Sequence, residues 1–327
     1  MFRKTMMLVP ALLILAACGV SSNEGVVSRE ENTGGFLGMS TLDQVEVEGD
    51  LSVINQMVIG SFTVGFVESS TESKQAGNFF SRGSGGKATG RVRLAGVDDA
   101  VKQAITDSAF DDFKARLMSS GFTVVERDAF TGSPAYQSAS KTSFPMMNDE
   151  SGLFSSYGET KLFQPTAFGA QGLQSGGTWN MNASKVVEYA KASNTAVVEA
   201  TYLVDFAATG GHEGAFSASI NVGQNLAVST ASVKFTHDWT STFQNGSPTV
   251  SLGQAVEADT VFGEVVDDSS GAEMAVEEAA NVLSVLMGGG TSRSRNYIIQ
   301  ADPAKYEEAA RDVLVRTNEM LLAKAPQ

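Results

Sequence analysis

The sequence predicts an α/β fold, in which a compact mixed sheet is flanked by helices and the second half of the chain is rich in strands. Residues 57–67 are mostly β-branched and aromatic, residues 98–120 carry apolar residues at helical spacing, and residues 122–125 are apolar again. This order describes a strand–helix–strand unit, which implies neighbouring parallel strands with a crossover helix. Apolar and polar residues alternate through parts of residues 196–262, as they do in strands.

Capping residues and apolar spacing set the boundaries of the expected helices. Between residues 98 and 120 apolar residues recur every four positions, and Gly121 stands where a C-terminal cap belongs. A closing helix is expected from Asp302 to Lys324, because Asp302 is a favoured N-cap and Pro303 suits the first helical position. We also expect helices at residues 184–192 and 271–287, a long polar loop at residues 68–96, and a loop with short elements at residues 128–178.

Charge and composition limit the classes of partner. The chain has 327 residues, 23 basic against 37 acidic side chains, and a formal net charge of −14. The densest basic spot is formed by Lys87, Arg91 and Arg93, which we expect in a glycine-rich loop. Nucleic-acid binding needs a clustered basic face, so the composition argues against it and favours a solvated acidic surface.

The first residues have the three-part layout of a secretory signal peptide. Two basic residues precede the apolar run Met6–Leu15, which is too short to span a bilayer comfortably, and two alanines follow it. The stretch Leu15–Cys18 also matches the lipobox of bacterial lipoproteins, in which the cysteine carries diacylglycerol and the signal is cleaved before it. Cys18 is the single cysteine of the chain, and lipidation accounts for a lone thiol in an exported protein.

This resemblance to lipoprotein precursors sets the expected organisation of the chain. Residues 1–17 are the signal peptide, residues 18–50 are the lipidated cysteine and a flexible tether, and residues 51–327 are a single α/β periplasmic domain. Gly19 stands where an Asp would favour retention in the inner membrane, so the resemblance implies the periplasmic face of a Gram-negative outer membrane. The alternative is an ordinary signal peptide with a chance cysteine.

A search for catalytic motifs returns little. His212 and His237 are too far apart for a short zinc motif, and the run Arg82–Gly86 lacks the glycine that would begin a nucleophile elbow. The same run lacks the first glycine and the hydroxyl residue of a phosphate-binding loop. Adjacent carboxylates on predicted helices point in different directions; these pairs are Asp98–Asp99, Asp111–Asp112 and Glu307–Glu308. We therefore expect no enzyme, no catalytic residue, no cofactor and no metal, with carboxylates assembled from distant segments as the hydrolase alternative.

The order of elements resembles the CsgG-type curli-secretion lipoprotein family and the related periplasmic lipoproteins that activate cell-wall synthases. The pieces that carry this resemblance are Cys18, the strand Val58–Phe62, the helix end Ser119–Phe122, the strand end Val124–Arg127, the helix and strand within Ser184–Tyr202, and the closing helix Asp302–Lys324. The chain departs from the family after Arg127, where a helix usually follows, because Phe130–Pro145 is rich in Gly, Ser and Thr.

The resemblance implies assembly rather than catalysis. It implies an outer-membrane lipoprotein that acts in envelope assembly, secretion or anchoring through protein partners, with self-association into a ring in the secretion version. Secretion members contribute two β-hairpins each to a membrane pore, and a membrane strand needs about nine to eleven residues. The alternation over Phe216–Val222 is shorter than that, so we expect a periplasmic domain, with membrane hairpins in residues 201–262 as the alternative. Regulation of a cell-wall synthase is the second expectation for function.

Overall fold

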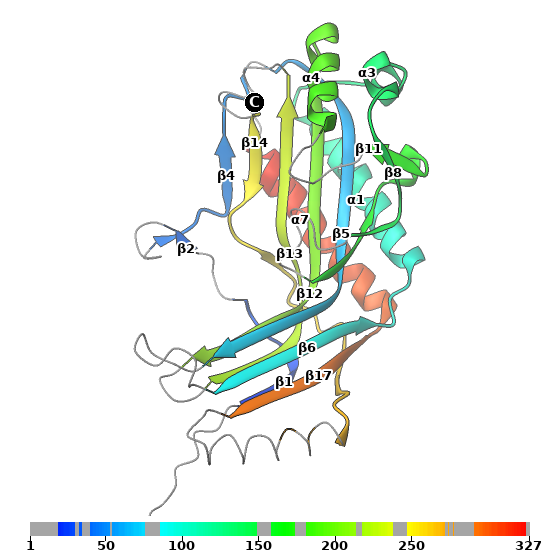
Figure 1. Cartoon of the computed structure of the whole chain (residues 1–327). Coiled ribbons are helices and arrows are strands. Elements are labelled where there is room, and N and C mark those ends of the chain that lie inside the picture. The colour runs from blue at the N-terminus through cyan, green and yellow to red at the C-terminus, as the bar shows by residue number, and fades with distance from the viewer. Residues whose placement is uncertain are drawn as a thin grey trace, which may run out of the picture.

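The computed structural model describes most of the chain as an α/β structure with one large mixed sheet (Figure 1). The residues it describes are 19–29, 33–34, 40–52, 54–75, 86–148, 158–173, 181–213, 218–237, 247–271, 274, 277 and 291–324. The predicted fold class, a mixed sheet flanked by helices with a strand-rich second half, is confirmed. Among the described residues, no helix is both long enough and apolar enough to cross a membrane.

The elements follow one another along the chain with bounds that can be given in a single list. They are β1 (Gly19–Val26), β2 (Thr33–Gly34), β3 (Ser40–Thr41), β4 (Val45–Glu48), β5 (Gln56–Gln75), β6 (Lys87–Ala95), α1 (Asp99–Ser119), β7 (Thr123–Val125), α2 (Arg127–Thr131), α3 (Pro134–Gln137), β8 (Lys141–Ser143), β9 (Met146–Asn148), β10 (Glu159–Phe163), η3 (Thr166–Phe168), β11 (Gln171–Leu173), α4 (Met181–Ser193), β12 (Ala196–Glu213), β13 (Ala218–Thr236), β14 (Thr249–Leu252), β15 (Val256–Glu257), β16 (Gly263–Asp267), β17 (Ser292–Ala301) and α7 (Pro303–Leu322).

The three long strands β5, β12 and β13 form the centre of the sheet, and helices cover both of its faces in the upper half of Figure 1. Successive strand residues point to opposite faces. On one face Met57 and Val198 join the main core, which contains the buried sides of α1 and α7. On the other face Val58 and Val197 join a smaller core with residues of α2, α3 and α4. The predicted strand–helix–strand unit is confirmed, because β5 and β7 pair in parallel on either side of α1 in the sequence.

The sheet forks where β12 separates from β5. Their parallel pairing ends at Val204 and Phe66. Beyond this point Ser69 of β5 pairs with β10 on one edge and with β6 on the other, so β6 occupies the edge that β12 leaves. One branch then consists of the end of β5 with β6, β17 and β16, and the other consists of the β12–β13 hairpin with β1. We call these the β6 branch and the β1 branch.

The two branches pack face to face through small and β-branched side chains. Ala88, Val92, Ile220 and Val222 are all buried. At Gly90 an added Cβ would lie 2.8 Å from Cγ2 of Val222, so glycine permits the close approach of β6 to β13. Strand-rich residues 201–262 therefore keep their alternating apolar side chains inside the protein.

The structure corrects the expected loop over residues 68–96. Residues 68–75 continue β5 and residues 87–95 form β6, so much of this stretch is an antiparallel pair. The basic spot of Lys87, Arg91 and Arg93 accordingly lies on a strand and not in a loop. The end of β5 has polar side chains on both of its faces, and this composition hides a strand from any reading based on alternation.

The flexible tether expected over residues 18–50 is also wrong for part of that range. β1 pairs in parallel with β13, and β4 pairs with β14 at an edge of the sheet. Backbone pairing with a distant strand supplies the order that this polar composition does not predict. The predicted helix at residues 271–287 lies mostly outside the described residues.

The expected loop over residues 128–178 contains short paired elements. β10 pairs with β5 and β9, and β11 pairs with β8. Helix α2 begins at Arg127, directly after the Val124–Glu126 stretch, so the helix that seemed to be missing from this point is present. The predicted helices at residues 98–120 and 302–324 are confirmed within one or two residues, and Asp302 accepts backbone N–H bonds as the N-cap of α7.

Candidate functional site

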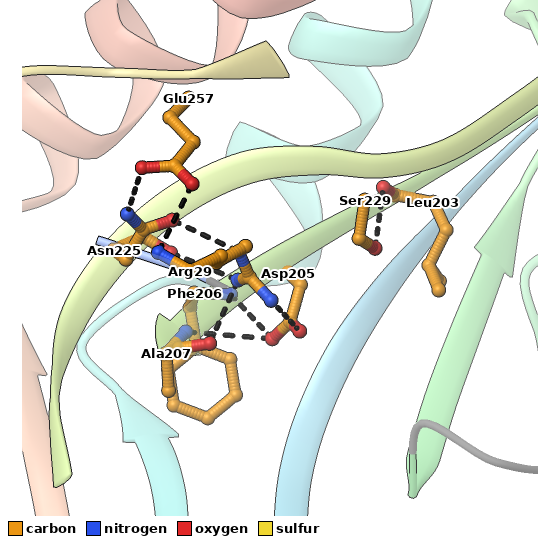
Figure 2. A network of polar contacts seen from close by, with 8 residues as sticks. All are labelled: Arg29, Leu203, Asp205, Phe206, Ala207, Asn225, Ser229 and Glu257. Carbon is orange, nitrogen blue, oxygen red and sulfur yellow. Dashed lines mark hydrogen bonds and ion pairs between the residues drawn. The ribbon is translucent and has the colours of Figure 1, made fainter. Parts of the chain in front are cut away.

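A buried polar cluster lies at the fork of the sheet, where β12 bends away from β5 (Figure 2). The register of β12 against β13 shifts between Asp205 and Ala207, which marks a bulge. The Asp205 carboxylate holds this bulge in shape, since its Oδ1 accepts the backbone N–H of Phe206 at 2.8 Å. Its Oδ2 accepts a bond from Nη1 of Arg29 at 2.9 Å. Asp205 thus links the bend of β12 to the N-terminal segment.

Arg29 uses every nitrogen of its guanidinium within this cluster. Besides the bond to Asp205, Nε donates to Oδ1 of Asn225 at 3.0 Å. Nη2 donates to the carbonyl oxygens of Ala207 at 2.7 Å and of Asn225 at 3.2 Å. The planar guanidinium has donors in a fixed fork and suits a site with several acceptors. Arg29 therefore connects the residues after β1 to both β12 and β13.

Glu257 closes the cluster from β15. Its Oε1 accepts the backbone N–H of Arg29 at 3.1 Å, and its Oε2 accepts Nδ2 of Asn225 at 2.8 Å. Asp205 and Glu257 come from distant segments and lie close to the same guanidinium group, as Figure 2 shows. Their carboxylates are acceptors for protein groups, an arrangement that binds segments together.

Gln224 joins the two branches next to this cluster. The side chain is fully buried and makes four hydrogen bonds to backbone groups. Its Nε2 donates to the carbonyls of Glu24 and Gly263 at 2.8 and 3.0 Å, and its Oε1 accepts the N–H groups of Phe262 and Gly263 at 2.9 and 3.0 Å. A single amide thus connects β1 and β13 to the start of β16. We call Arg29, Asp205, Gln224, Asn225 and Glu257 the fork clamp.

Charged and phenolic groups also lie on the helix side of the fork. Nζ of Lys102, on α1, forms an ion pair with Glu68 at 2.5 Å, and the Lys102 side chain is almost fully buried. Tyr306, at the start of α7, is fully buried and its hydroxyl lacks a hydrogen-bond partner in the described part of the chain. Burial raises the pKa of Tyr306 well above its ordinary value, and the charges of Glu68 and Asp205 add to this shift.

The other residues considered in the sequence do not gather at one place. His212 lies near the start of the β12–β13 hairpin tip and His237 follows the opposite end of β13. Among the carboxylate pairs, Asp98 caps its own helix whereas Asp99 forms an ion pair with Lys161. Within the described ranges, no group of three or more histidine, cysteine or acidic side chains could hold a metal ion.

Arg127, which ends the Val-Val-Glu-Arg motif, packs against aromatic rings. Its guanidinium carbon lies 3.9 Å from the centroid of the Phe168 ring and 5.7 Å from that of Tyr136. Nη2 donates to the carbonyl of Gly60 at 3.4 Å. Cation–π contacts of this kind stabilise packing, so the motif fixes β5 against the segment after β7.

Cys18, the one site residue named from the sequence, lies outside the described residues. The structure begins at the next residue, Gly19, which is already part of β1 and pairs with Ser219. Sequence reasoning missed the fork clamp, because Arg29 is a single basic residue in a polar stretch and its partners are about 170 to 230 positions away. Comparisons with family models, with curated proteins and with solved structures return no match.

Proposed function

We propose that the protein is an outer-membrane lipoprotein, anchored at the periplasmic face through lipid on Cys18, that acts in envelope assembly, secretion or anchoring by binding protein partners. The lipobox Leu15–Cys18 supports the anchor. The observation that carries the proposal is the strand that begins one residue after this cysteine and belongs to the main sheet.

The connection between anchor and body decides what an anchored domain can do. A flexible tether over residues 18–50 would reach up to about 100 Å when extended, so its domain could move far from the membrane. Here β1 pairs with β13, and Arg29 is bound to Asp205, Asn225 and Glu257. Acyl chains on Cys18 would therefore hold the β1 branch close to the bilayer and give the whole protein a fixed position.

Edge strands supply surfaces through which such a positioned protein could assemble. β4 and β16 are the two end strands of the main sheet path. Each carries an exposed valine, since Val47 is 46% exposed and Val266 is 47% exposed. Unprotected edges with apolar side chains are templates for pairing with another chain. These edges support the protein-binding part of the proposal, including self-association.

The mass of the acylated protein in detergent tests this part of the proposal. Size-exclusion chromatography with light scattering is expected to give more than one copy per particle. Changing Val47→Lys and Val266→Lys together should shift the particle toward one copy, because charge opposes edge pairing. Met118→Lys is the matched control, since Met118 is 56% exposed on helix α1. A strict monomer for the unaltered protein would remove self-association from the proposal.

A further inference from the structure

Three basic side chains line the outer face of β6. Lys87, Arg91 and Arg93 are exposed, whereas the residues between them include the buried Ala88 and Val92 that pack against the β1 branch. Side chains alternate along a strand, so the three cations share the face that points away from the protein. Their cross-strand neighbours on that face are uncharged: Ser69, Thr71, Ser292, Ser294 and Asn296.

These cations differ from most others of the described chain in their pairing. Arg29, Lys102, Arg116, Lys161 and Arg295 each form an ion pair with a carboxylate. Within the described ranges, no carboxylate pairs with Lys87, Arg91 or Arg93, and Arg91 instead donates to the Ser294 hydroxyl at 2.7 Å. A chain with a net charge of −14 thus keeps three adjacent cations free of ion pairs on one strand.

The basic face lies at the same end of the protein as the lipobox cysteine. A Cβ at Gly90 would lie 3.9 Å from Cγ1 of Val20, so the inner side of β6 touches a residue two positions after Cys18. Lys87 is the first residue of β6 and Gly19 is the first residue of β1. The carboxylate of Glu159, which bonds to Ser69, lies at the end of the face farthest from Lys87.

We propose that Lys87, Arg91 and Arg93 contact phosphate-bearing anionic lipid headgroups of the membrane that carries the Cys18 anchor. The inference deepens the proposed function, on which it rests for the anchor itself. Charges near an anionic surface act within a Debye length of about 8 Å, so nearby cations outweigh the distant acidic surface of the protein. One lipid attachment fixes a single point, and the basic face adds a second contact that sets the tilt of the protein on the bilayer.

Vesicle binding of the unacylated chain tests the basic face without the anchor. Residues 18–327 carrying Cys18→Ser are mixed with vesicles of phosphatidylglycerol or of phosphatidylcholine at low salt, and bound protein is measured by sedimentation. Near an anionic surface each cation contributes about fivefold to the partition coefficient. We therefore expect at least tenfold stronger binding to phosphatidylglycerol, and its loss at high salt.

Two triple variants with the same net charge separate a local face from general attraction. Lys87→Gln, Arg91→Gln and Arg93→Gln together should lower binding to phosphatidylglycerol at least tenfold. The control triple, Lys114→Gln, Lys191→Gln and Lys324→Gln, lies on or after helices and should keep most of the binding. Near-UV circular dichroism checks that each protein is folded.

Each outcome separates the basic face from the anchor. Equal binding of the unaltered chain to the two lipids overturns the inference, and so does an equal loss in the two triple variants. If β6-dependent binding is present but acyl labelling of Cys18 is absent, the proposed anchor fails and the basic face stands. If labelling is present but the lipid preference is absent, the anchor stands and the basic face fails.

Discussion

Arg29 is the residue that ties the N-terminal segment to the body of the protein. Its backbone and guanidinium reach β12, β13 and β15 through Asp205, Asn225 and Glu257. The Asp205 side chain is only 9% exposed, so its charge depends on Arg29 for compensation. A buried charge left without its partner is costly, and this dependence makes Arg29 the most sensitive point of the fork clamp.

Removing the Arg29 side chain should destabilise the protein strongly. Arg29→Ala is expected to lower the free energy of unfolding by about 3 kcal/mol, because it strands the Asp205 carboxylate and several carbonyl groups. Lys185→Ala removes the exposed ion pair with Glu188 and should cost less than about 0.5 kcal/mol. Urea unfolding measures both values. Equal costs for the two variants would show that the clamp contributes little.

Buried tyrosines predict a loss of stability at alkaline pH. The pKa values of Tyr202, Tyr297 and Tyr306 are raised by burial above the ordinary 10.0, so these phenols keep their protons in the folded state while the unfolded chain loses them. The folded state then binds more protons, and its stability falls as the pH rises above 10.0. Below that pH the contribution is fully present.

Tyr306→Phe provides a direct test of this alkaline loss. Because the Tyr306 hydroxyl has no hydrogen-bond partner among the described groups, the variant should be as stable as the unaltered protein at neutral pH and lose less stability above pH 10.0. Tyr202→Phe should cost about 1 kcal/mol at neutral pH, since it removes the bond to Asn318. Urea unfolding across the alkaline range measures both, and a Tyr306→Phe curve parallel to that of the unaltered protein would contradict the explanation.

At the scale of elements, the long strands β5 and β12 each serve two parts of the protein. The first part of each strand lies in the helix-covered sheet, and the second part lies in one branch of the fork. The first parts are apolar on both faces and were predicted as strands over residues 57–67 and 196–206. The end of β5 is polar, with Glu72 and Lys74 as an ion pair 3.9 Å apart, and its strand character could not be predicted from apolar alternation.

Local signals explain which elements could be predicted. Helix α1 has apolar residues at helical spacing and the Asp98 cap, and α7 has the Asp302 cap, so their positions follow from nearby residues. β1 and β6 have no comparable local signal, because their order comes from pairing with β13 and β17, about 200 positions away. The fork clamp depends on the same distant pairings and was missed for the same reason.

Gly90 tests the packing of the β6 branch on the β1 branch. Gly90→Ala would place a Cβ 2.8 Å from Cγ2 of Val222 and 3.3 Å from Cγ2 of Ile220. Valine is stiff and buried, so relief of this contact should cost about 1–3 kcal/mol. Gly271→Ala is the control, since a Cβ there meets nothing within 4 Å. Thermal unfolding compares the two, and an unchanged Gly90→Ala protein would mean that the branches do not pack as described.

At the scale of the whole molecule, the protein combines an α/β body with a forked end from which the N-terminal segment leaves. The body carries helices on both sheet faces, and the fork brings β1, the basic strand β6 and the β12–β13 hairpin together (Figure 1). The fold class and the lipobox were visible in the sequence. The rigid link between them depends on contacts of Arg29 and Gln224 that only the structure reveals.

Acylation of Cys18 is the claim on which the membrane account depends. Cells expressing the protein are grown with radioactive palmitate, and the immunoprecipitated chain is counted. The account predicts labelled unaltered protein and no label in the Cys18→Ser variant, with the Ser28→Cys variant of Cys18→Ser also unlabelled because its cysteine lies outside the lipobox. An unaltered protein that incorporates no palmitate would contradict the account.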